Sequence, residues 1–169
     1  MSHLEWSDDL SLDLPEMDDT HREFVELLAL VKNASDEQLT TAWSTLIKHT
    51  EEHFAREDRW MRDTRFSSTN CHTTQHKVVL EVMREGEANS LSGNPDVIRA
   101  MARELAKWFP QHAQSMDAAL ALHLRRVGYD VISGVVSMPQ ALPVDEIRGC
   151  ASATCSPSAA HEVKRPRSS

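Results

Sequence analysis

The chain has 169 residues, of which 40% are hydrophobic, and a formal net charge of −8, so it can fill the core of one domain. The negative charge, with no sustained Lys/Arg cluster before the last few residues, excludes the phosphate contacts that hold nucleic acid. The N-terminus has no basic segment followed by an apolar run, so we expect no export signal. No 18 consecutive residues are apolar, so we expect no membrane span. The odd cysteine count (Cys71, Cys150 and Cys155) lacks zinc-ribbon spacing and favours a reducing compartment, so we expect a cytoplasmic protein.

The first half of the chain predicts two helices. Only five glycines, abundant helix formers and no alternating β-branched run indicate an all-α fold. After an extended N-terminal arm over residues 4–15, a first helix is expected to begin near Asp18 or Asp19. Ser35, with a glutamine three residues later, forms a capping box for a second helix that should end near Asp63.

The second half predicts two more helices. A loop over residues 66–70 leads into a third helix, and Asn94 caps a fourth that has Pro95 in its first turn and Gly128 as its stop. The predicted inward stripe of the fourth helix is Val97, Met101, Leu105, Trp108 and His112. Four long helices with short loops predict an up-down-up-down antiparallel four-helix bundle.

The chain divides by composition into two parts. Residues 1–130 hold the arm and the bundle. Residues 131–169 contain four prolines among Ser and Ala, which predicts a loosely ordered C-terminal tail. The first part of this tail, residues 131–142, is apolar enough to dock on the bundle.

Histidines and carboxylates occupy inward positions on all four predicted helices. They are His21, His53, Glu57, His72, His76, His112 and Asp117. Each inward histidine alone is more often a hydrogen-bonded core residue, and each pair at four-residue spacing is weak by itself. Together they predict a metal site, because no Lys or Arg lies on the inward stripes of the second and third helices to neutralise a buried carboxylate. Nitrogen and oxygen ligands without thiolate favour non-heme iron or manganese over zinc or copper.

Asp117 does not fit a straight helix. Five residues place it about 140° around the axis from His112, away from the shared face. Pro110 removes the hydrogen bond to the carbonyl of Ala106 and so favours a local distortion. We therefore expect either a side chain that reaches around the helix or a π-type turn between His112 and Asp117.

In order and spacing these residues resemble the seven-ligand signature of the hemerythrins, including the segments HFARE and HAQSMD. The resemblance covers roughly residues 4–130, is closest to the bacterial single-domain members, and extends to flanking residues such as Trp6, Phe54 and Met61. It implies two iron ions (Fe2+/Fe3+) that are bridged by Glu57, Asp117 and an oxo or hydroxo group. The histidine ligands implied for one iron are His72, His76 and His112, and those for the other are His21 and His53.

The same resemblance implies that dioxygen binds reversibly at the iron with two histidines, for oxygen storage, delivery or sensing. The predicted pocket over that iron is lined by Phe24, Trp108, Phe109 and Ala113. The sequence departs from the family pattern at Ala113, where a bulkier aliphatic residue is expected, and at Leu120, where a Tyr is common.

Two alternatives stay open. A di-iron enzyme acting on peroxide, nitric oxide or ferrous iron would use the same ligands, and a sensor would pass the ligand state to a redox or signalling partner through the tail. Five histidines with two carboxylates favour binding over catalysis, since oxygen-activating bundle enzymes tend to have four carboxylates. We assign no ligand role to Cys71 or to the histidines outside the spacing, which are His3, His49, His123 and His161.

Overall fold

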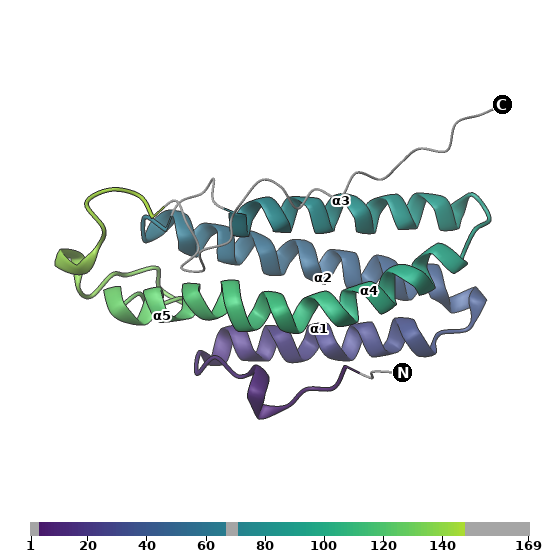
Figure 1. Cartoon of the computed structure of the whole chain (residues 1–169), viewed down its shortest axis with the longest axis horizontal. Helices are drawn as coiled ribbons and strands as arrows, with labels where there is room; N and C mark the ends of the chain where they lie inside the picture. Colours follow the sequence, from purple (N-terminus) through teal and green to yellow (C-terminus); the bar gives the residue numbers. More distant parts are fainter. Residues whose placement is uncertain (1–3, 67–70, 148–169) are drawn as a thin grey trace.

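The computed structural model describes residues 4–66 and 71–147, and in these ranges the fold is an all-helical bundle (Figure 1). The helices are α1 (Pro15–Asn33), α2 (Asp36–Asp63), α3 (Cys71–Leu91), α4 (Asp96–His112), the π-helical segment η2 (Ala113–Asp117) and α5 (Ala118–Val127). The last three are consecutive and form the fourth long helix of the bundle. Sequential neighbours pack on each other and α1 also packs on α4, which confirms the predicted up-down-up-down topology. Among the described helices, none has the length and apolar character that crossing a bilayer requires.

Helix α1 begins at Pro15, so the predicted start near Asp18 or Asp19 was wrong. A proline suits the first turn because its fixed φ is helical and its missing N–H would have no partner there. Asp18 instead holds the N-terminal arm to the helix. Its carboxylate accepts hydrogen bonds from the Ser11 hydroxyl and the Leu12 backbone N–H, both at 2.7 Å. The arm is not extended throughout, since it contains the short 3-10 helix η1 (Asp8–Leu10).

Three of the five buried positions of α4 lie one residue after the predicted ones, whereas Leu105 and His112 are buried as predicted. Its buried residues are Ile98, Ala102, Leu105, Phe109 and His112. Trp108, which was predicted to face inward, is half-buried. Apolar side chains fill two adjacent rows of this helix, and both rows satisfy the three-to-four spacing, so periodicity could not choose between them. Pro95 is the N-cap, so the predicted cap at Asn94 with Pro95 in the first turn was wrong.

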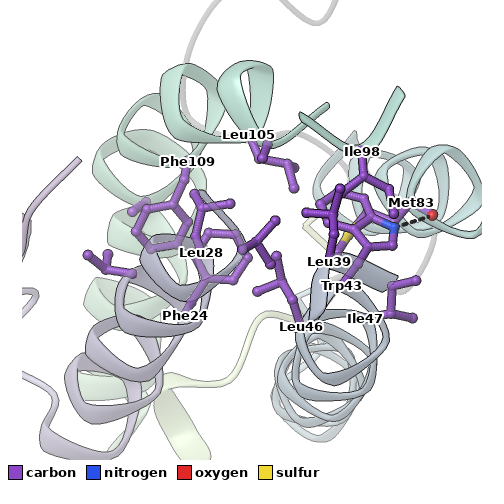
Figure 2. Packing of buried hydrophobic residues seen from close by; sticks show 14 of the residues in the cluster. Phe24, Leu28, Leu39, Trp43, Leu46, Ile47, Met83, Ile98, Leu105 and Phe109 are labelled. Atoms are coloured by element: carbon purple, nitrogen blue, oxygen red, sulfur yellow. Dashed lines mark hydrogen bonds between the residues drawn. The ribbon is translucent and has the colours of Figure 1, made fainter. Parts of the chain in front are cut away.

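A cluster of buried hydrophobic side chains packs between the helices of the bundle (Figure 2). Phe24 of α1 stacks on Phe109 of α4 with 4.6 Å between ring centroids. Trp43 of α2 is completely buried, and its indole Nε1 donates a hydrogen bond of 2.9 Å to the Met83 carbonyl of α3. This bond joins two neighbouring helices inside the core.

The chain turns back onto the bundle after α5. Gly128 ends the helix as predicted, with a left-handed φ of 61°. The following segment contains the 3-10 helix η3 (Pro139–Ala141), and Ile147 pairs with Phe66 at the end of α2. Apolar residues of this segment pack on a second hydrophobic cluster and are Val131, Val136, Leu142 and Ile147. The predicted docking of residues 131–142 is therefore confirmed, while the tail from residue 148 lies outside the described residues.

Replacing Trp43 with Phe should lower the free energy of unfolding of metal-free protein by about 2 kcal/mol. The smaller ring leaves a void and removes a buried hydrogen bond. Urea denaturation followed by circular dichroism measures the change. Leu30→Ala, at a position 62% exposed, is the control and should change the value by less than about 0.5 kcal/mol. A change equally small for Trp43→Phe would contradict the importance of this contact.

Candidate metal centre

The seven predicted site residues come together inside the bundle. Helix α1 contributes His21, and the remaining six come in pairs from α2, α3 and the fourth helix. None of the seven is more than 3% exposed, so the site is closed to bulk water. Residues four apart on α2 and on α3 present both side chains to the same face, which is why these pairs converge.

The ligand atoms form two overlapping groups, and within each group all atoms lie within 4.8 Å of one another. The three-histidine group consists of Glu57, His72, His76, His112 and Asp117. The two-histidine group consists of His21, His53, Glu57 and Asp117. Both carboxylates therefore belong to both groups, and the histidines divide three and two.

Each of the five histidines directs Nε2 toward a shared carboxylate. The distances are 2.9 Å for His53 to Glu57, 2.9 Å for His72 to Asp117, 3.1 Å for His21 to Asp117, 3.1 Å for His112 to Asp117 and 3.3 Å for His76 to Glu57. The Nε2 atoms of His76 and His112 are themselves 3.3 Å apart. Five imidazole nitrogens that converge on two carboxylates form the donor set of a cation site.

A π-helical turn brings Asp117 to the face of His112. The backbone N–H of Ala118 bonds to the carbonyl of Ala113, five residues back. This wider turn accommodates one additional residue, so positions five apart lie one above the other. The expected π-type turn is confirmed, and it begins three residues after Pro110.

The two carboxylates are ionised although they are completely buried. Burial raises the pKa of Glu57, but the nearby charge of His53 and the close approach of the surrounding imidazoles outweigh it and hold this pKa well below its usual range. Burial and the charge of Glu57 also raise the pKa of Asp117, but the charge of His112 and the close approach of the His112 and His21 imidazoles outweigh them and hold it well below its usual range. Within the described residues, no Lys or Arg pairs with either carboxylate. Positive charge must therefore come from the imidazoles or from a bound cation.

Several buried atoms of the site lack a hydrogen-bond partner within the part of the chain that the structure describes. They include His21 Nε2, His72 Nε2, Glu57 Oε2 and both carboxylate oxygens of Asp117. Each unsatisfied buried polar group costs on the order of 1–3 kcal/mol, more if charged. A cation bound between these atoms removes that cost, so the residues present fit a metal.

The predicted ligand pocket is divided in the structure. Phe109 meets the His21 ring edge-on at a centroid distance of 5.2 Å, and Ala113 is completely buried. Trp108 instead stacks on His112 at 4.4 Å, so it borders the three-histidine group and not the side on which it was predicted. The one-position shift of the buried face of α4 explains this correction.

Other predicted non-ligands lie outside both groups. His49 Nε2 is 3.2 Å from the carbonyl of Thr20, and His123 Nε2 is 3.0 Å from the carbonyl of Thr64. His3 and His161 lie outside the described residues. Cys71 belongs to neither group, and its sulfur is disulfide-bonded, so the expectation of reduced cysteines was wrong for this residue.

Two contacts of the histidines were not predicted. Asp58 accepts a hydrogen bond from His76 Nδ1 at 2.9 Å, and Gln75 Oε1 lies 3.1 Å from His112 Nδ1. Each of these residues is adjacent in sequence to a candidate ligand, and helical spacing directs it away from the shared face. Only the packing of α2, α3 and α4 shows that it meets the outer nitrogen of a histidine on a neighbouring helix.

Residues 12–122 match the family model described as the hemerythrin HHE cation binding domain. The chain belongs to the hemerythrin family. It is 35% identical over 130 residues to a bacteriohemerythrin of Ralstonia nicotianae, covering 77% of this chain and 95% of that protein. A bacteriohemerythrin of Pseudomonas paraeruginosa is 26% identical over 122 residues, which cover 70% of this chain and 79% of that protein. A bacteriohemerythrin of Stenotrophomonas maltophilia is 26% identical over 125 residues, which cover 72% of this chain and 81% of that protein. The predicted family is confirmed, and all seven site residues lie inside the matched range.

Metal-free protein should lose stability as the pH rises toward 10. Burial lowers the pKa of His21 and His72, but the close approach of the Asp117 and Glu57 carboxylates outweighs it and raises these values from 6.5 to about 9 and about 10. The bound protons therefore stabilise the folded chain fully below pH 6.5, and this contribution falls progressively until the pH passes 9 to 10. Calorimetry in chelator-treated buffers should show a falling Tm over this range.

Histidine variants test the origin of this pH dependence. In the double variant His21→Gln/His72→Gln, the Tm should change much less between pH 7 and 10. His123→Gln, which changes a histidine outside both groups, should keep the full pH dependence. A Tm that does not change between pH 7 and 10 in the unaltered chain would contradict the assignment.

Proposed function

We propose that this chain binds dioxygen reversibly at a centre of two iron ions, for oxygen storage, delivery or sensing. The observation that carries the proposal is the unequal division of histidines between two groups that share both carboxylates. A metal ion in the two-histidine group has one protein ligand fewer than its neighbour. A metal site with an incomplete set of protein ligands keeps a position for an external ligand.

The donor set supports iron. It consists of imidazole nitrogens and carboxylate oxygens without thiolate, which suits non-heme iron or manganese. Glu57 and Asp117 have the positions that bridging ligands require, because each belongs to both groups. Two iron ions with an oxo or hydroxo group, once bound by these residues, would supply the electrons that dioxygen takes up on binding and returns on release.

The protein's contribution is to balance charge and exclude water. Five neutral imidazoles add no charge, so the two carboxylates compensate part of the charge of two buried cations. Phe109 packs edge-on against His21 of the two-histidine group, Phe24 stacks on Phe109, and Ala113 is buried on the same helix as His112. Further oxidation chemistry needs protons and water, which an apolar enclosure limits. This environment favours reversible binding over the alternative of a di-iron enzyme that acts on peroxide, nitric oxide or ferrous iron.

We also infer that the metal-binding unit is residues 1–130 and that residues 131–169 are an appended tail. All seven site residues and the family match precede residue 131. The first part of this tail packs on the cluster that contains Trp60 and Phe66 and so stabilises that end of the bundle. A redox or signalling partner would bind to the tail.

The purified chain should contain two iron ions and change colour reversibly with oxygen. Metal analysis gives the stoichiometry. Anaerobic reduction, exposure to air and removal of oxygen, followed by near-ultraviolet and visible absorption, give the reversibility. One ion per chain, or mainly zinc after growth without added zinc, would overturn the di-iron proposal. One-way bleaching with turnover of peroxide or nitric oxide would instead support the enzyme.

Glu57→Gln should reduce the iron content from two ions toward one. A neutral amide bridges two cations poorly and leaves excess positive charge in a site from which water is excluded. Glu52→Gln is the matched control, because Glu52 is an exposed glutamate on the same helix, and it should keep both ions. If Glu57→Gln retained two irons and reversible oxygenation, the bridging role would be refuted.

A further inference from the structure

The outer nitrogens of the five histidines differ in what they contact. In the three-histidine group, His76 Nδ1 meets the Asp58 carboxylate and His112 Nδ1 meets the Gln75 amide oxygen. The Nδ1 atoms of His21, His53 and His72 have no hydrogen-bond partner among the residues that the structure describes. Both supported histidines therefore belong to one group, and the two-histidine group has no such support from described residues.

Trp108 determines the orientation of the Gln75 amide. The indole Nε1 of Trp108 is 3.3 Å from Gln75 Oε1, the same oxygen that lies 3.1 Å from His112 Nδ1. An indole N–H can only donate, so the amide must present its oxygen and not its NH2 group. That oxygen can only accept, so the proton of neutral His112 must be on Nδ1.

The proton on Nδ1 leaves a lone pair on His112 Nε2, which faces Asp117 at 3.1 Å. Asp58 has the same effect on His76, because a carboxylate oxygen accepts and thereby keeps a proton on Nδ1. When both rings are neutral, the two Nε2 lone pairs lie 3.3 Å apart. Two lone pairs at this separation repel each other unless a proton or a metal ion lies between them.

We propose that Trp108, Gln75 and Asp58 are positioning residues that keep the proton of His112 and His76 on Nδ1. The three-histidine group therefore binds a metal ion before the two-histidine group does. This inference rests on the proposed function for its metal, but the tautomers belong to the protein alone. A neutral histidine offers Nε2 to a metal only when its proton is on Nδ1. The three-histidine group has two ligands already in that form, whereas His21 and His53 lack a described partner that selects it.

Nitrogen NMR of metal-free, full-length chain tests the tautomer of His112 without any metal. The unaltered chain should show a protonated Nδ1 on His112. Trp108→Phe keeps an aromatic ring against His112 but removes the donor that orients the amide, so a second tautomer should appear. Gln75→Leu should have the same effect, and Gln75→Glu should restore the Nδ1–H signal. A protonated Nε2 in the unaltered chain, or an unchanged signal in Gln75→Leu, would overturn the proposal.

Titration with Zn2+, followed through the same side-chain signals, tests the order of loading. The first equivalent of Zn2+ should shift the side-chain nitrogen signals of His72, His76 and His112. The second equivalent should shift those of His21 and His53. Gln75→Leu and Asp58→Asn should each weaken binding of the first ion by about 10-fold or more, as is usual when a partner of a ligating histidine is removed. Gln111→Leu, at an exposed glutamine on α4, should leave binding unchanged.

Simultaneous shifts in both groups, or an unchanged first affinity in Gln75→Leu and Asp58→Asn, would overturn the proposed order. Ordered uptake of Zn2+ by a chain that shows no reversible oxygenation would support the positioning roles and refute the proposed function alone. The two proposals therefore fail on different measurements.

Discussion

The structure depends on two ionised carboxylates held in the middle of a bundle without an arginine or lysine to pair with them in the described residues. An unpaired buried carboxylate costs several kcal/mol, which is a large part of the net stability of a domain. Five imidazoles surround Glu57 and Asp117 and reduce this cost through hydrogen bonds and charge. The bundle is therefore most stable when positive charge, as protons or as metal ions, occupies its centre.

Helix geometry explains how one core accommodates both the polar site and a hydrophobic cluster. Pairs of residues four apart keep the ligands of α2 and α3 on one face, and apolar residues continue the same stripes toward the end that contains Trp43 and Phe24. The fourth helix achieves this with a π-helical turn, since its two ligands are five residues apart. Without that turn, Asp117 would leave the face that His112 occupies.

The two ends of the metal centre differ in their surroundings, and the difference matches their proposed roles. Next to His21 lies Phe109, which stacks on Phe24, and neither ring offers a polar group. Next to His112 lie Gln75 and Trp108, which form hydrogen bonds and restrict the imidazole. One end thus has the features that hold a metal firmly, and the other has the apolar environment that the proposed binding of a small neutral ligand requires.

The sequence by itself determined the fold class, the family and the seven residues that converge, because ligand types recur at helical spacing and cannot be buried singly without cost. It also indicated the distortion between His112 and Asp117, since the five-residue spacing disagrees with a straight helix. Tertiary structure alone decided which row of α4 faces the core, because Trp108 and Phe109 satisfy the same periodicity and differ only in what packs against them. It likewise decided that Asp58 and Gln75 meet the outer nitrogens of His76 and His112, since each contact joins two helices whose relative rotation is set by packing and not by local sequence.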